Sequence, residues 1–170
     1  MTTTYGALVA TYLAEPTPAT LAALRSAVRS APGFTPDLAA DALARPLLDR
    51  GAYGEAVTAL SALMPGAMLS PSAHTVLAEA LTGAGRTDAA RREESLARAA
   101  LSSILSTGDG TAARPWSVLR VSDEYDVLSA LGKRSRRQSV DRVGSRHLDR
   151  HECEDGSELV FDVTGLFPRG

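Results

Sequence analysis

The chain has 170 residues and a formal net charge of -2, with 44% hydrophobic and 22% charged residues. These values are typical of a globular protein and argue against an intrinsically disordered chain. The balance of charge also argues against a nucleic-acid partner, which requires a net basic surface. Aromatic residues make up only 5% of the chain, which indicates closely packed helices with a core of alanine and leucine.

The sequence predicts a cytoplasmic protein that does not associate with membranes. Its single cysteine, Cys153, cannot form a disulfide within the chain, so nothing indicates an oxidising compartment. Residues 1–16 lack the basic start of a secretory signal and contain Glu15 soon after a short apolar run. The apolar runs are all much shorter than the ~20 residues of a membrane-spanning helix.

Residues 1–110 carry apolar residues at helical spacing and an internal repeat. GAYGEA and GRTDAA begin at Gly51 and Gly85, and 85 − 51 gives a period of 34 residues. Each glycine is expected to end the first helix of a hairpin in a left-handed conformation. The period resembles that of tetratricopeptide repeats. With a weaker copy upstream, it predicts three helical hairpins, at about 3–30, 36–64 and 71–106.

Residues 111–170 change character and predict a β-α-β-β-β unit. WSVLRV at 116–121 is expected to form a strand, and Ser122 to cap the helix that follows. Three further strands, one pair joined by an Asp-Gly turn, are expected to complete a small antiparallel sheet. The sequence therefore predicts an α+β fold, with a helical region over 1–110 and a sheet domain over 111–170.

Several short motifs run from the third predicted hairpin into the sheet: His74, SILSTGDG at 103–110, SDEYDVLSALG at 122–132, Gln138-Ser139, Asp149 and Phe161-Asp162. On these motifs the chain resembles a bacterial family of uncharacterised function. In that family a tetratricopeptide-like region leads through a GDG junction into a DEY helix and a short sheet. The resemblance covers most of the chain. It implies the fold, and it implies no reaction and no ligand.

A first candidate site is the concave groove that the first helix of each hairpin would line. Short polar and charged side chains at inward positions suit the binding of an extended peptide or a partner helix. The alternative is that three hairpins form too shallow a groove, or that the C-terminal sheet fills it. The expected groove residues are Thr11, Asp41, Arg45, Thr75 and Glu79, with His74 near the rim.

A second candidate site is a polar face of the predicted sheet. Carboxylates there could support acid–base chemistry or bind a divalent cation, although buried polar residues in a small sheet more often bind backbone amides. His151 and Cys153 would lie about 7 Å apart on one strand face and could share a zinc ion. An ordinary half-exposed strand is the simpler interpretation. The carboxylate site would comprise Glu124, Gln138, Asp149 and Asp162.

The run KRSRR at 133–137 follows the predicted helix and is either a solvated loop or a docking edge for an acidic partner. The sequence contains no phosphate loop and no serine or cysteine nucleophile motif. We therefore predict a non-enzymatic protein-interaction module, without a cofactor, that uses the groove or the 133–137 edge. The alternatives are a small enzyme or metal-binding protein centred on the sheet, and a homo-oligomer joined through a sheet edge.

Overall fold

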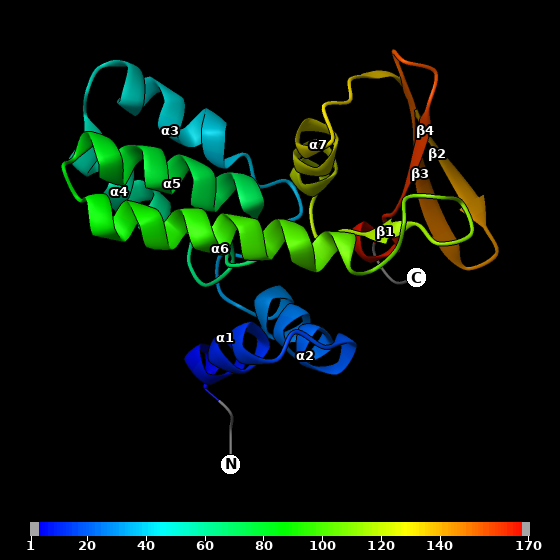
Figure 1. The fold of residues 1–170 in the computed structure, drawn as a ribbon, viewed down its shortest axis with the longest axis horizontal. Coiled ribbons are helices and arrows are strands. Elements are labelled where there is room, and N and C mark those ends of the chain that lie inside the picture. The colour runs from blue at the N-terminus through cyan, green and yellow to red at the C-terminus, as the bar shows by residue number, and fades with distance from the viewer. Residues whose placement is uncertain (1–3, 168–170) are drawn as a thin grey trace.

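The structure is a computed structural model that describes residues 4–167. The predicted α+β fold is confirmed, because helices come first and a sheet follows (Figure 1). The helices are α1 (Tyr5–Ala14), α2 (Pro18–Arg29), α3 (Ala40–Asp49), α4 (Tyr53–Ser61), α5 (Pro71–Gly83), α6 (Thr87–Leu105) and α7 (Val121–Ala130). The strands are β1 (Trp116–Ser117), β2 (Ser135–Val143), β3 (Arg146–Cys153) and β4 (Glu158–Asp162), followed by a short 3-10 helix (Thr164–Leu166).

Helices α1 to α6 form three hairpins, each within the range that the sequence predicts. Gly51 follows α3 and Gly85 follows α5, and both have a φ of 75°. This is the left-handed conformation that ends a helix and favours glycine. Ala56 and Ala90 are buried in one core cluster between the paired helices. The hairpins and their glycine ends are thus confirmed, while the tetratricopeptide relationship stays a prediction.

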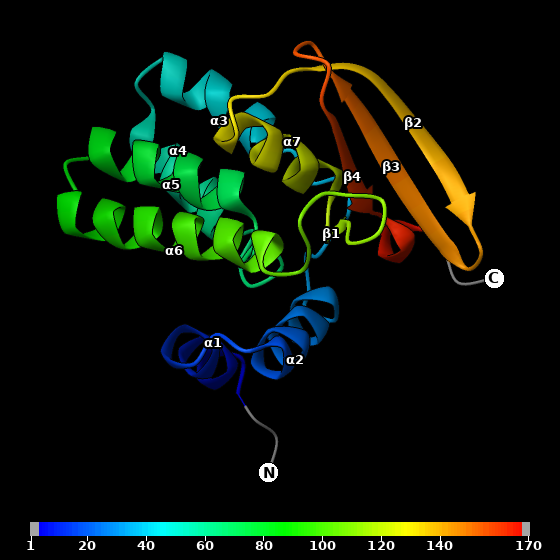
Figure 2. The ribbon, with the colours of Figure 1, turned by 45° about the vertical axis from the view of Figure 1, so that its right-hand side comes forward.

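The first hairpin lies apart from the other two. Helix α3 packs on α4 and α5, and α5 packs on α6. The α1–α2 hairpin lies on the opposite side of α6 from α3 in two different views (Figures 1 and 2). Its buried residues Tyr12, Leu24 and Val28 form a cluster with Leu69 and Leu119. Helix α1 therefore does not continue the surface that α3 and α5 form.

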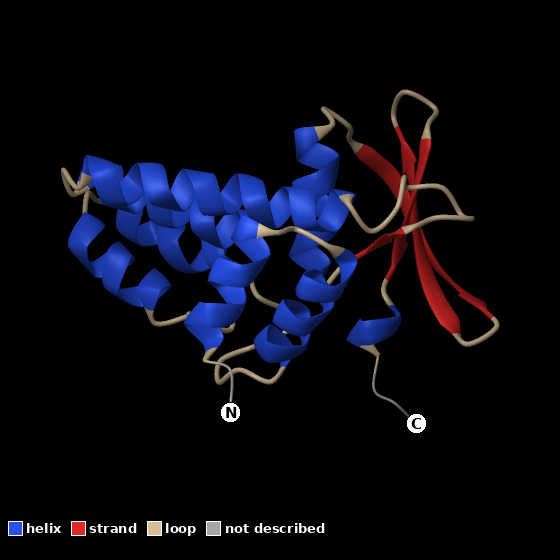
Figure 3. Ribbon diagram, turned by 60° about the horizontal axis from the view of Figure 1, so that its bottom comes forward, coloured by secondary structure: helices blue, strands red, loops and turns tan. Residues whose placement is uncertain are grey.

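The sheet has the strand order β1-β4-β3-β2 and stands at one end of the helical part (Figure 3). Strands β2, β3 and β4 pair antiparallel, but β1 pairs parallel with β4. The prediction of a wholly antiparallel sheet is therefore wrong at β1. The chain leaves β1 through α7, reaches the far edge of the sheet and returns through two hairpins, so β4 runs in the same direction as β1.

Helix α7 starts earlier than predicted, and Ser122 is not its cap. The predicted strand over 116–121 ends at Ser117, and the helix begins at Val121. The carboxylate of Asp123 accepts hydrogen bonds from the backbone amides of Leu119 (2.9 Å) and Arg120 (3.0 Å). This side chain turns the backbone into the helix, because it satisfies amides that a helix start leaves without partners.

The loop before α7 joins the sheet to the helices. The Arg120 side chain is fully buried, donates a hydrogen bond to the carbonyl of Gly66 and lies 5.1 Å from the centre of the Phe34 ring. Arg25 of α2 donates to the carbonyl oxygen of Ser117 at 3.0 Å. Residues of the first hairpin, the loop after α4 and β1 thus meet at one buried junction.

The end of α6 belongs to the core of the sheet. Ile104 is buried together with Trp116 of β1, Val127 of α7 and Phe161 of β4, with Leu101 packed against them. The predicted boundary near residue 110 therefore crosses a shared apolar cluster. Within residues 4–167, no helix has the length and apolar character needed to cross a lipid bilayer.

Candidate functional site

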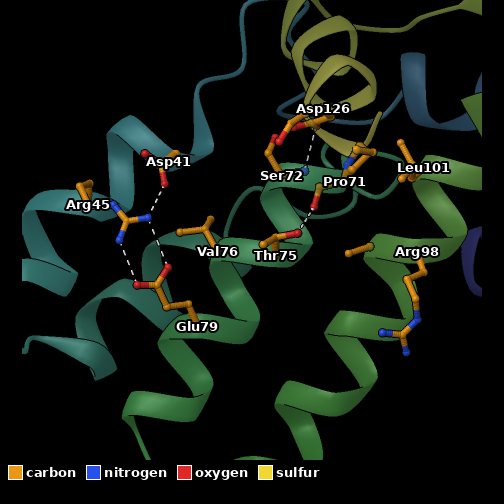
Figure 4. A pocket seen from close by; sticks show the side chains of 13 residues that line it. Asp41, Arg45, Pro71, Ser72, Thr75, Val76, Glu79, Arg98, Leu101 and Asp126 are labelled. Atoms are coloured by element: carbon orange, nitrogen blue, oxygen red, sulfur yellow. Dashed lines mark hydrogen bonds and ion pairs between the residues drawn. The ribbon is translucent and has the colours of Figure 1, made fainter. Parts of the chain in front are cut away.

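An open groove of about 350 Å³ lies where α3, α5, α6 and α7 meet (Figure 4). Helix α7 borders one end of it, so the C-terminal part limits the groove through a helix and not through the sheet. Four of the six predicted groove residues line it, namely Asp41, Arg45, Thr75 and Glu79. The sequence analysis did not identify the others, among them Ser72, Val76, Arg98, Leu101 and Asp126.

Arg45 joins α3 to α5 at one side of the groove. Its guanidinium pairs with Asp41 at 2.6 Å and with Glu79 at 2.9 Å. Hydrogen bonds from Arg45 to Asp41 and Glu79 raise its pKa further above its usual range. The side chains of Arg45 and Glu79 remain 42% and 50% exposed. Exposed pairs of this kind contribute only about 0–1 kcal/mol, so the pairs can rearrange at little cost.

Asp126 fixes α7 against the start of α5. Its carboxylate accepts a hydrogen bond from the backbone amide of Ser72 at 3.0 Å. Burial raises the pKa of Asp126, although the hydrogen bonds with Ser72 oppose the increase. An acidic side chain at a helix start is favoured by the helix dipole. This contact sets the end of the groove, and no motif in the sequence links the two residues.

Two predicted groove residues lie elsewhere. His74 is buried, with its ring nitrogens 2.6 Å from a carboxylate oxygen of Glu93 and 2.6 Å from the carbonyl oxygen of Met68. One residue step turns a helix by about 100°, so His74 faces α6 while the next residue faces the groove. Thr11 is exposed on α1 and donates to the carbonyl of Ala7 at 2.8 Å. It lies outside the groove because the first hairpin packs on the other side of α6.

The second candidate site exists in part, as a buried cluster of Glu124, Asp149 and His151. These residues are 1%, 3% and 0% exposed, and one potential ligand atom from each lies within 4.8 Å of the others. His151 Nε2 is 3.0 Å from Glu124 Oε2, and its Nδ1 is 2.9 Å from Ser135 Oγ. Gln138 Nε2 donates to Asp149 Oδ2 at 2.5 Å.

Tyr125 covers the buried cluster from α7. Its hydroxyl donates to Gln138 Oε1 at 2.9 Å, and its ring meets the His151 ring edge-on at 5.6 Å. Burial raises the pKa of Glu124 to about 7, and the Asp149 carboxylate adds to the increase while the hydrogen bond to His151 opposes it. Neither Ser135 nor Tyr125 was predicted from the sequence. Ser135 reaches His151 through the pairing of β2 with β3, and Tyr125 reaches it through the packing of α7 on the sheet.

Asp162 and Cys153 are not part of this cluster. In the register of β3 with β4, Asp149 faces Phe161, and Asp162 faces Leu148. Side chains alternate along a strand, so Asp162 lies on the opposite face of the sheet, where it pairs with Arg146 at 3.1 Å. Cys153 shares the face of His151, but it is buried in the apolar core. The weaker alternative, a zinc ion shared by His151 and Cys153, thus gives way to a cluster of His151 with two carboxylates.

The basic run over 133–137 leads into β2, the edge strand of the sheet. Its charges are partly matched by nearby acids: Lys133 pairs with Asp155, and Arg136 and Arg137 lie 3.7 and 3.9 Å from Glu152. Arg136 and Arg137 are still 70% and 73% exposed. The run is an accessible edge, and its residues Lys133, Arg134 and Ser135 line an open hollow of about 580 Å³ together with the end of α7.

No protein-family model, no curated protein and no solved structure matches this chain. The function must therefore be argued from the chemistry of the groove and of the buried cluster themselves.

Proposed function

We propose that the protein is a non-enzymatic interaction module that binds a protein segment in the groove between α3, α5, α6 and α7. The open groove itself carries this proposal. The Arg45–Glu79 pair stands on one side and Arg98 on the other, with Thr75 and Val76 between them (Figure 4). The exposed charges offer a peptide charged partners, and the partly exposed Ala97 and Leu101 offer an apolar contact, while Val76 is buried beneath the surface.

The other accessible regions support this function less well. A second hollow, of about 690 Å³, lies between α2 and the end of α6. Among the described residues that line it, Arg25 alone is charged, and its guanidinium already donates to Ser117. The hollow at the 133–137 edge is bordered by a basic run whose charges are already partly matched by Asp155 and Glu152. The groove combines exposed charges of both signs from α3, α5 and α6 with apolar side chains of α6 and α7.

The proposal includes a cytoplasmic location and a protein or peptide partner, without a cofactor. Cys153 is a buried free thiol, which suits a compartment where thiols stay reduced. Both walls of the groove are formed by packed helices, so the groove is largely preformed and little conformational entropy is lost when a segment binds. An edge-to-edge oligomer through β2 is a separate possibility that the groove does not require.

The test is to fill the groove and to compare this with a matched change elsewhere. Thr75→Trp places a large ring between Arg45 and Arg98. Thr11→Trp is the control, because each threonine is exposed and donates to the carbonyl four residues before it, at 2.9 and 2.8 Å. Wild type and both variants, checked by circular dichroism, are used for affinity capture from the soluble lysate, read by mass spectrometry.

We expect that wild type and Thr11→Trp enrich the same partner. Its enrichment by Thr75→Trp should be at least tenfold lower. Equal enrichment by all three proteins would place the interaction outside the groove. No specific enrichment by the wild-type protein would contradict the interaction function itself.

A further inference from the structure

The buried cluster contains a polar atom without a partner. Asp149 is 3% exposed, and its Oδ2 accepts from Gln138, but its Oδ1 has no hydrogen-bond partner within the described part of the chain. That Oδ1 atom lies 3.9 Å from His151 Nε2. Buried carboxylate oxygens are nearly always satisfied. An orphan oxygen that faces a histidine nitrogen and a second carboxylate indicates a missing positive group.

The surrounding hydrogen bonds hold the cluster in a fixed orientation. Ser135 Oγ occupies the Nδ1 side of His151, which leaves Nε2 directed at Glu124. Gln138 orients Asp149 and is itself held by Tyr125. In metal sites, outer hydrogen bonds of this kind fix the histidine tautomer and the carboxylate rotamer. The cluster therefore has both inner donors and outer support.

We propose that Glu124, Asp149 and His151 bind one Zn²⁺ ion. One imidazole nitrogen with two carboxylate oxygens is a donor set that zinc accepts, whereas Ca²⁺ and Mg²⁺ prefer oxygen donors alone. Two carboxylates also balance the charge of a divalent ion inside the protein. This site is independent of the groove, since none of its three ligands lines the groove.

The geometry is close to what zinc requires. Donor atoms about 2.0–2.2 Å from a tetrahedral zinc stand about 3.4 Å apart. Here Nε2 is 3.0 Å from Glu124 Oε2 and 3.9 Å from Asp149 Oδ1. Both distances differ from that spacing by about half an ångström or less, and all three donor atoms lie within 4.8 Å of one another. The competing explanation is a proton that the two carboxylates share. The experiment below distinguishes this proton from a zinc ion.

The full-length protein is stripped with a chelator and titrated with Zn²⁺ against a competing chelating dye. We expect one ion per chain, with binding at least 100-fold weaker in Glu124→Gln and in Asp149→Asn. Asp162→Asn is the matched control, because it removes a carboxylate from the other face of the sheet, and it should bind like wild type. Gln138→Ala, which removes an outer hydrogen bond, should weaken binding by about 10–100-fold.

A second measurement on the wild-type protein is decisive even if a variant fails to fold. The chain has three histidines, so their ring ¹⁵N resonances can be assigned by through-bond NMR, with His147→Asn at the half-buried His147 as a check. Stoichiometric Zn²⁺ should shift the Nε2 resonance of His151, and Mg²⁺ should not. If the His151 resonances do not change, or if only His147 responds, the two carboxylates share a proton and the proposal is overturned.

Discussion

At the scale of single residues, the buried carboxylate of Asp123 stabilises the start of α7. It is 1% exposed and caps the backbone amides of Leu119 and Arg120. Burial raises the pKa of Asp123 from 3.8 to about 6, although the nearby Arg120 charge opposes the increase. Between about pH 4 and pH 6, Asp123 is therefore protonated in the folded protein and ionised in the unfolded chain.

This pKa predicts a pH dependence of stability. The contribution of Asp123 to the free energy of unfolding should be largest below about pH 4. It should fall by up to about 3 kcal/mol as the pH rises through 6. Asp123→Asn keeps a hydrogen-bond acceptor but cannot titrate, so its slope should be smaller. Urea unfolding of both proteins at several pH values between 4 and 7 measures the difference. Identical slopes would show that Asp123 does not titrate in this window.

The sequence could not reveal these buried charges. Asp123 and Glu124 lie in the first turn of α7, where the helix dipole favours acidic side chains. Both are nevertheless only 1% exposed, whereas the larger apolar side chains of Tyr125 and Leu131 are 48% and 42% exposed. The partners that make burial tolerable, such as His151, come from distant positions in the chain. Helical periodicity carries no information about them.

At the scale of elements, contact between the second and third hairpins depends on a glycine. A Cβ atom at Gly83, the last residue of α5, would overlap the Tyr53 ring of α4, whereas one at Gly54 would meet no atom within 4 Å. Gly83→Ala should therefore lower stability by about 1–3 kcal/mol. Gly54→Ala should raise it by about 0.5 kcal/mol, because alanine favours the helix. Chemical denaturation compares the two, and equal effects would contradict this packing.

Elements set by local signals were predicted well, and those set by long-range pairing were not. The glycines and alanines that repeat at 34 positions predicted the hairpins correctly. Strand β1 has only two residues, and its parallel pairing with β4 follows from the path of the chain through α7. The groove was predicted from α1, α3 and α5, but the packing of the first hairpin on the far side of α6 removed Thr11 from it.

At the scale of the whole molecule, the helices and the sheet should unfold together. Leu101 and Ile104 of α6 share a core with the sheet, and Arg120 is buried at the junction with the first hairpin. A fragment of residues 1–110 would expose these surfaces, so we expect it to lose cooperative thermal unfolding. Circular dichroism melts of the fragment and the full chain compare them. A fragment that melts cooperatively at the same temperature would show two independent domains.

In our proposal a partner binds in the groove and not at the basic edge. Amide hydrogen exchange of the protein, with and without the captured partner, tests this most directly. We expect slower exchange in the groove helices, over 40–49, 71–83, 87–105 and 121–130, with the edge strand unchanged. Protection confined to 133–143 would contradict it and would move the binding site to the arginine-rich edge of the sheet.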